Sequence, residues 1–234
     1  MGSDEVHVWR AALNCGTPRL HELLQTLSTD ERARARRFYF QQDREHFIVA
    51  RGLLRVILGR YLVIDPGQLR LCCSPCGKPF VAIEYGGEAL RFNVSHSHGL
   101  ALYAIARGRE LGVDLERIRP ELADAQLAEH FFSLREVAML RALPTSLRQE
   151  AFFRCWTRKE AYVKAKGEGL SCPLGRFDVS LAPGEPAALL STPDDPQEAS
   201  RWSLRELFPG SDYVAAVAVE GHGWRLQCWQ WPGA

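Results

Sequence analysis

Two acidic side chains, Asp114 and Glu116, stand two residues apart in the run from Gly112 to Glu116. Alternate residues of a β-strand point to the same face, so a strand here presents both carboxylates together while Val113 and Leu115 face a core. Adjacent carboxylates repel one another, and burying them is costly unless they share a cation. The pair therefore predicts either a divalent-metal site or the acidic face of a strand at the protein surface.

A tryptophan, a glutamate and a lysine recur at four-residue intervals in a segment with a helical pattern. On a helix, Trp156, Glu160 and Lys164 lie one above another on the same face. Such a stripe suits an exposed helix, where the Glu160–Lys164 pair contributes ~0.3–0.5 kcal/mol. A tryptophan is costly to leave in water, so the stripe also suits a helix that covers a polar, partly buried site. Gly167 and Gly169 end the helix, and the backbone amides freed there could meet an anion.

Polar and apolar side chains alternate in the run from Phe92 to Ser97. Asn93, Ser95 and Ser97 share one strand face, and His96 falls on the other. Ser95 beside His96 is not a hydrolase arrangement, because adjacent strand residues point apart. A histidine at a strand end is commonly a packed or capped residue, but hydroxyl, amide and imidazolium groups are also good phosphate ligands.

Basic side chains that suit a multiply phosphorylated small molecule occur in a turn and on two helical segments. The turn holds Lys78 between Gly77 and Pro79. The arginines of the helical segments also fit a second interpretation, the exposed face of a helical hairpin. They are Arg32, Arg34, Arg36, Arg37, Arg51 and Arg55.

The elements that must position these groups alternate between strands and helices. Hydrophobic periodicity predicts a strand over 5–12, helices over 19–27, 28–40 and 42–61, and strands over 69–71, 79–83, 90–95, 100–106 and 111–116. The second half has the same style, with helices over 127–132, 134–143 and 147–166, strands over 177–181, 187–190, 202–207, 213–219 and 224–229, and a loop over 192–197. Ser28 with Glu31, and Ser133 with Glu136, predict capping boxes at two helix starts. This order predicts an α+β protein with two similar halves that meet near residue 108.

Length and charge restrict the class of protein. A chain of 234 residues, 46% of them hydrophobic, can bury a sizeable core. The 29 Lys and Arg residues nearly balance the 28 Asp and Glu residues, so no global field attracts nucleic acid or an anionic membrane. No apolar run approaches the ~20 residues of a membrane span, and the N-terminal segment lacks the build of a secretory signal. We expect a soluble, cytoplasmic protein without nucleic-acid or membrane partners.

Seven cysteines are scattered through the chain, and their odd number does not indicate a disulfide framework. Cys73 and Cys76 form a CxxC pair next to Cys72, but no second pair follows at the spacing of a zinc site. Gly77 and Pro79 follow at once, which is unlike the helix start of a thioredoxin-type redox pair. Ordinary free thiols are predicted.

Four motifs in this order resemble the Sfp-type 4'-phosphopantetheinyl transferases: GKP at 77, FNVSHS at 92, GVDLE at 112 and WTRKEAYVKAKGEGL at 156. The resemblance covers roughly residues 28–180. It implies two pseudo-twofold-related subdomains, each a small, mainly antiparallel sheet packed with helices, within a monomer built as a pseudo-dimer. Residues 1–108 would bind the phosphates and adenine of coenzyme A. Residues 109–234 would hold the metal site, the catalytic helix and the docking surface for the carrier protein.

The resemblance also implies roles for individual residues. Asp114, Glu116 and Glu160 match the acidic ligands of Mg²⁺, with Mn²⁺ as the alternative ion. Glu160 matches the general base, which acts directly or through a metal-bound water. Lys164 matches the lysine that meets the pyrophosphate, and Asp114 completes the catalytic set. The coenzyme-binding positions matched are Arg34, Arg51, Gly77, Lys78, Pro79, Asn93, Ser95, His96 and Lys164. His96 and Arg34 would hold the ribose 3'-phosphate, although Glu31 stands where other members often have a lysine.

The implied reaction moves the 4'-phosphopantetheine arm of coenzyme A to a serine of an apo acyl, peptidyl or aryl carrier protein and leaves adenosine 3',5'-bisphosphate. Fatty-acid, polyketide, nonribosomal-peptide and aminoadipate systems all offer such carriers, and residues 131–143 are the candidate docking region by analogy. Two other functions use the same side chains. One is a metal-dependent pyrophosphate hydrolase. The other is a phosphate-binding interaction module, against which the near-zero net charge argues.

Overall fold

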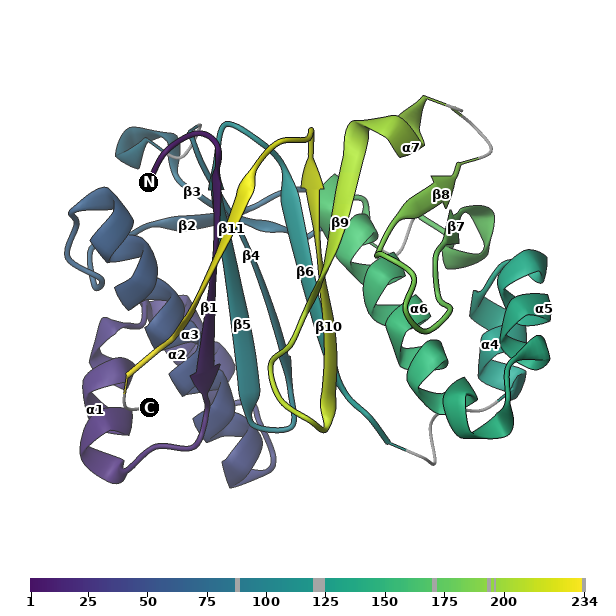
Figure 1. Ribbon diagram of the computed structural model, residues 1–234. Helices are drawn as coiled ribbons and strands as arrows, with labels where there is room; N and C mark the ends of the chain where they lie inside the picture. Colours follow the sequence, from purple (N-terminus) through teal and green to yellow (C-terminus); the bar gives the residue numbers. More distant parts are fainter. Residues whose placement is uncertain (87–88, 120–124, 170–171, 193–194, 196, 233–234) are drawn as a thin grey trace.

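Two sheets stand at the centre of the protein, with helices on the outer side of each (Figure 1). The computed structural model describes all residues except 87–88, 120–124, 170–171, 193–194, 196 and 233–234. Three apolar cores hold the layers together. One lies between the two sheets, and the other two lie between each sheet and its own helices. The α+β class predicted from the sequence is confirmed.

The first sheet has the strand order β11-β1-β5-β4. Its strands are β1 (Glu5–Ala12), β4 (Leu90–Ser97), β5 (Leu100–Arg107) and β11 (Arg225–Gln230). The helices on its outer face are α1 (Thr17–Thr26), α2 (Thr29–Ala35) and α3 (Gln41–Leu62). The Tyr103 hydroxyl on β5 donates to the Ala50 carbonyl oxygen on α3 (3.0 Å), which ties the longest of these helices to the sheet. A small hairpin of β2 (Leu71–Cys73) and β3 (Pro79–Val81) and a short 3₁₀ turn (Ile83–Tyr85) follow α3.

The second sheet has the order β6-β10-β9 and is entirely antiparallel. Its strands are β6 (Leu111–Arg117), β9 (Trp202–Leu207) and β10 (Tyr213–Glu220). The helices of this half are α4 (Ala125–Phe131), α5 (Leu134–Ala142), α6 (Thr145–Lys166) and α7 (Glu198–Arg201). A 3₁₀ turn at Leu174–Arg176 and a small hairpin of β7 (Asp178–Val179) and β8 (Leu189–Ser191) lie between α6 and α7 in the chain. Helix α6 packs along β6 and β10, and Gly167 ends it in the left-handed region at φ +73°.

Local signals in the sequence located most elements well. Strand β1 has the predicted bounds, and both predicted capping boxes are formed, at Ser28 with Glu31 and at Ser133 with Glu136. The helix predicted over 28–40 is too long, because α2 ends at Ala35. Beyond it, Phe38 packs against Phe47 with ring centroids 5.3 Å apart, and the chain leaves the helical path. The predicted loop at 192–197 lies partly outside the described residues.

The last strand, β11, pairs with the sheet of the first half, although the sequence predicted a division into halves at residue 108. The turn between β5 and β6 falls there, but β11 pairs in parallel with β1, from Glu5 opposite Arg225 to Arg10 opposite Gln230. This pairing covers the backbone groups along the edge of β1. Residues 225–230 therefore belong to the sheet of the first half, not to the second half in which the sequence placed them.

No helix in the described part of the chain is both long and apolar enough to cross a membrane. All seven cysteines are free thiols, as predicted, and Cys73 and Cys76 are both exposed.

Candidate active site

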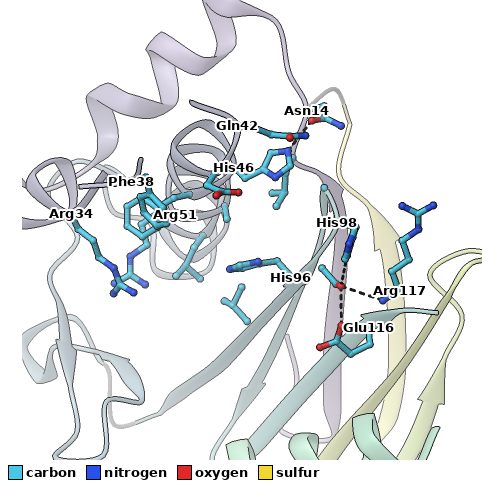
Figure 2. A pocket seen from close by; sticks show the side chains of 18 of the residues that line it. Asn14, Arg34, Phe38, Gln42, His46, Arg51, His96, His98, Glu116 and Arg117 are labelled. Carbon is cyan, nitrogen blue, oxygen red and sulfur yellow. Dashed lines mark hydrogen bonds between the residues drawn. The ribbon is translucent and has the colours of Figure 1, made fainter. Parts of the chain in front are cut away.

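A cavity of about 910 Å³ opens where the helices of the first half meet β4 and β6. Arg34 of α2 and Arg51 of α3 lie on one side of it, as Figure 2 shows. His96 projects from β4 into the middle, and Glu116 of β6 lies on the other side. The structure thus brings together the arginines of the helical segments, the strand histidine and one of the paired acids.

A second cavity of about 390 Å³ adjoins the first, and His96 and Glu116 belong to the walls of both. Its other walls include Asp114 of β6 together with Glu160 and Lys164 of α6. Trp156 also lines it and packs against Phe131 and Phe152, so the aromatic ring is covered by protein on one side. The stripe on α6 therefore covers a polar, partly buried site, which is the second of the two interpretations that the sequence allowed.

Strands β4 and β6 are joined by side chains rather than by a backbone ladder. Residues 93, 95 and 97 share one face of β4, and each offers an oxygen to a backbone N–H of β6. The bonds run from Val113 N to Asn93 Oδ1 (2.9 Å), from Leu115 N to Ser95 Oγ (3.2 Å) and from Arg117 N to Ser97 Oγ (3.2 Å). The face that the sequence suggested for phosphate contacts is thus used to connect the two halves, and β6 is held in register beside β4.

Asp114 lies at the centre of a network of short polar contacts and is 3% exposed. Its Oδ1 atom accepts hydrogen bonds from Ser95 Oγ (2.9 Å) and Lys164 Nζ (2.6 Å). Its Oδ2 atom is buried and has no hydrogen-bond partner among the described residues. A buried carboxylate oxygen without a partner is costly, so this atom is suited to a further cation.

The three acids influence one another electrostatically. Burial, together with the charge of Asp114, raises the pKa of Glu160, and the charge of Lys164 opposes that rise. Burial and Asp114 likewise raise the pKa of Glu116, against the hydrogen bond from Ser97. Carboxylates that repel in this way are stabilised by a shared divalent ion. No group of three His, Cys, Asp or Glu side chains in the described chain is gathered tightly enough to form a ready metal site, but the oxygen donors and the unpartnered Asp114 Oδ2 fit Mg²⁺.

The charges around His96 favour its neutral form. Although its ring is open to the cavity, removal from bulk water lowers its pKa, and the positive charges of Lys164 and His46 lower it further. An anion bound in the cavity reverses this effect, because negative charge favours the imidazolium.

The lysine of the predicted turn lies away from both cavities. Lys78 Nζ donates to Glu110 Oε2 (2.9 Å) and to the carbonyl oxygen of Ala165 at the end of α6 (2.8 Å). Gly77 forms the tight turn at φ +82°, and Pro79 does line the larger cavity. The structure therefore gathers Pro79 with His96 and Arg34 but does not bring the Lys78 ammonium to them.

The arginines of the predicted basic cluster do not all face one space: Arg32 and Arg36 line a separate cavity beside α1. Arg34 and Arg51 line the larger cavity. Arg55, by contrast, is only 2% exposed, and its guanidinium is held by Glu31 (2.6 Å) and by the carbonyl oxygens of Pro66 and Leu69. The sequence predicted that Arg55 lines a phosphate pocket or lies on the exposed face of a helical hairpin, and both predictions are wrong. Its N–H groups instead bond to buried partners that are distant in the sequence.

Sequence reasoning missed several side chains of the larger cavity, among them Gln42, His46 and His98. His46 also bonds to Asn14, with 2.9 Å between Nε2 and Oδ1. Gln42 and His46 are four residues apart on α3, and Ala50 and Leu54 continue the same face into the cavity wall. This four-residue spacing could have identified Gln42 and His46 as cavity residues, because it places them on one face of α3, near the space that Arg51 lines.

Comparison with known proteins shows the family to which this architecture belongs. Residues 110–218 match the 4'-phosphopantetheinyl transferase superfamily model, and residues 14–107 match the model for the N-terminal part of 4'-phosphopantetheinyl transferases. The chain is 46% identical over 229 residues to the 4'-phosphopantetheinyl transferase HetI of Nostoc sp., an alignment that covers 98% of this chain and 93% of that protein.

Two relatives from Bacillus are more distant. The chain is 30% identical to the 4'-phosphopantetheinyl transferase Sfp of Bacillus subtilis, with 66% of each chain covered. It is 31% identical to a 4'-phosphopantetheinyl transferase of Bacillus pumilus, with 73% of this chain and 70% of that protein covered. All three relatives are transferases, which favours group transfer over the hydrolase and the interaction module. The chain belongs to the 4'-phosphopantetheinyl transferase superfamily and is a transferase of this kind.

Proposed function

We propose that the enzyme uses coenzyme A as its donor and transfers the 4'-phosphopantetheine arm to a serine of an apo carrier protein, in a reaction that depends on Mg²⁺. The observation that carries this proposal is the juxtaposition of the two cavities. One presents Arg34, Arg51 and His96, which suit a ribose phosphate and a pyrophosphate. The other presents three carboxylates and Lys164 at its edge. Mn²⁺ is the alternative ion, because the same oxygen donors accept it.

Each residue has a definite part in the proposed chemistry. Glu160 accepts the proton of the carrier serine, directly or through a water, as a general base. The serine oxygen then bonds to the phosphorus that carries the pantetheine arm, and the bond from that phosphorus to the bridging pyrophosphate oxygen breaks. Adenosine 3',5'-bisphosphate departs with the electron pair, and Lys164 stabilises its new negative charge. Asp114, Glu116 and Glu160 would hold Mg²⁺, which would neutralise the charge of the pyrophosphate.

The carrier is proposed to dock on α5, beside the catalytic helix. Leu134 at the start of α5 is 91% exposed, and the side chains of Arg135 and Arg141 are also largely exposed. An apolar residue flanked by cations suits an acidic carrier surface. Acyl, peptidyl and aryl carriers are all candidates. We further propose that the enzyme acts as a monomer in the cytoplasm, where its seven free thiols stay reduced.

The test is to incubate the protein with coenzyme A, MgCl₂ and a panel of apo-carrier proteins and to follow the mass of each carrier. Addition of one phosphopantetheine group to one serine is the expected result, whereas a hydrolase leaves the carrier mass unchanged. Glu160→Gln should lower the rate by at least about 10²-fold, because the base is lost. Glu150→Gln, on the same helix but paired with Arg154 (2.7 Å), is the matched control and should transfer at the wild-type rate. Wild-type transfer by Glu160→Gln overturns the assignment of the base.

A further inference from the structure

The hydroxyl of Ser97, at the end of β4, makes three contacts that the reaction scheme leaves unexplained. It accepts the backbone N–H of Arg117 (3.2 Å), lies 3.2 Å from His98 Nδ1 and donates to Glu116 Oε2 (3.0 Å). Dashed lines end at these three labelled residues in Figure 2. The residue is 8% exposed, so water competes little for these bonds. The hydroxyl is therefore attached to the backbone of β6 on one side and to an acidic side chain of the same strand on the other.

Ser95 makes the same pair of contacts two residues earlier. Its hydroxyl accepts the N–H of Leu115 (3.2 Å) and donates to Asp114 Oδ1 (2.9 Å). In both cases a serine of β4 bonds the N–H of one β6 residue and the carboxylate of the residue before it. This repeat follows from the two-residue period of paired strands, since neighbouring positions on one face of β4 meet neighbouring positions of β6.

Resting on the function proposed above, we propose that Ser97 is a positioning residue that orients Glu116 as a ligand of the divalent metal ion. Glutamate has one more rotatable bond than aspartate, and Glu116 lies in the walls of both cavities, so its carboxylate has space to turn. A hydrogen bond to Oε2 fixes the plane of that carboxylate and directs Oε1. Outer partners of this kind orient metal ligands, and their removal typically costs 10–100-fold in metal affinity.

A purely structural role for Ser97 makes a different prediction. In that case its only function is to accept the N–H of Arg117 and so to join β4 to β6. Asn93 provides the comparison, because it accepts the N–H of Val113 (2.9 Å) in the same row of side-chain bonds. Within the described part of the chain, its side chain bonds no carboxylate. If joining the strands is all that matters, substitution of Asn93 and of Ser97 should have the same consequences.

The experiment measures the dissociation constant of Mn²⁺ by electron paramagnetic resonance, with no coenzyme or carrier present. Ser97→Ala should bind Mn²⁺ about 10–100-fold more weakly than the wild-type protein. Ser97→Thr retains the hydroxyl and should bind within about threefold of wild type. Asn93→Ala should lose thermal stability, as Ser97→Ala does, but keep the wild-type Mn²⁺ affinity. Equal Mn²⁺ affinity in Ser97→Ala and wild type, or equal weakening in Asn93→Ala, overturns the role of Ser97.

Glu116→Gln separates this proposal from the proposed function. It should weaken Mn²⁺ binding at least as much as Ser97→Ala does. If Mn²⁺ binds Glu116→Gln as tightly as the wild-type protein, the metal site itself is wrong, and the role of Ser97 falls with it. If Glu116→Gln weakens binding and Ser97→Ala does not, the metal site stands and only the positioning role is lost.

Discussion

Lys164 Nζ lies 2.6 Å from Asp114 Oδ1, so a cation from α6 contacts the most deeply buried of the three acids on β6 and α6. The contact also joins the catalytic helix to the strand that carries two of the carboxylates. Under the proposed function the same ammonium group stabilises the leaving group, so Lys164 would have one role in the free protein and another during transfer.

Removing this ammonium group should separate its two roles. In Lys164→Gln the negative charge of Asp114 has no ammonium beside it, so the free energy of unfolding should fall by about 1–3 kcal/mol without metal. Mg²⁺ should stabilise this variant more than it stabilises wild type, because a competing positive charge has gone, while the transfer rate falls. Thermal unfolding with and without MgCl₂ measures the first effect. Lys166→Gln, which loses contacts to Glu168 and Glu198 instead, is the control. A Mg²⁺-induced stabilisation no larger in Lys164→Gln than in this control contradicts the argument.

Coenzyme A should bind with uptake of a proton at His96. In the free protein the pKa of His96 lies below its ordinary value of 6.5, because of reduced contact with water and the nearby charges of Lys164 and His46. A bound phosphate raises that pKa again, so a proton enters near neutral pH, and affinity for coenzyme A should rise as the pH falls from 8 towards 6. Calorimetry in two buffers of different ionisation enthalpy measures the uptake. His96→Gln should abolish it, and His21→Gln, which alters a residue of α1, should not. Undiminished uptake in His96→Gln places the titrating group elsewhere.

Glu31 should prove to be a major stabilising residue of the first half. Burial acts to raise its pKa, but the charge of Arg51 and the hydrogen bonds from Arg55 and Ser28 outweigh burial and leave the pKa below its ordinary value of 4.5. Glu31→Gln leaves the buried guanidinium of Arg55 without its anion, which should cost about 3–5 kcal/mol in unfolding free energy. The exposed pair of Glu22 and Arg19 offers the control, and Glu22→Gln should cost less than about 1 kcal/mol.

The pH dependence of this effect has a definite sign. A glutamate with a lowered folded pKa contributes stability that is complete above its unfolded pKa of about 4.5. That contribution is lost as the pH falls through the lower folded value. Denaturant unfolding should therefore show a large difference between wild type and Glu31→Gln at pH 7 and a shrinking difference below pH ~4.5. A difference that stays constant into acid would mean that the ion pairs of Glu31 do not carry its stabilising effect.

Glu31 also illustrates how far the sequence could predict this structure. Its capping box with Ser28 was predictable, because the two residues are three apart and the signal is local. Its ion pairs with Arg51 and Arg55 were not, because 20 and 24 residues separate the partners and their contact depends on how α2 packs against α3. For the same reason, helix and strand positions were largely correct, while the return of β11 to the first sheet was missed.

The candidate site divides in the same way. Strand alternation correctly placed Asp114 with Glu116, and helical spacing placed Glu160 with Lys164, but periodicity alone could not show that the two pairs share a cavity. Order and identity of the motifs supplied that link. Asn93, Ser95 and Ser97 were predicted to share a face, and they do. That this face joins the two halves depends on β6 lying beside β4, which no local pattern encodes.

Leu134→Asp should weaken recognition of the carrier and leave recognition of coenzyme A intact. The side chain is almost fully exposed at the first residue of α5, so its replacement should not unfold the protein. If this residue anchors the carrier, a charge that repels an acidic surface should lower kcat/KM for the carrier by at least about tenfold, as loss of an interface anchor does. Val63→Asp is a matched control, since Val63 is 93% exposed, lies at the end of α3 and has a left-handed φ of 57° that aspartate tolerates. Initial rates over a range of carrier and coenzyme A concentrations separate the two substrates. Equal kcat/KM values for the carrier in Leu134→Asp and Val63→Asp would place the docking surface away from α5. A lower kcat/KM for the carrier alone in Leu134→Asp supports docking on α5, because neither residue lines the coenzyme cavity and coenzyme A binding should be unchanged.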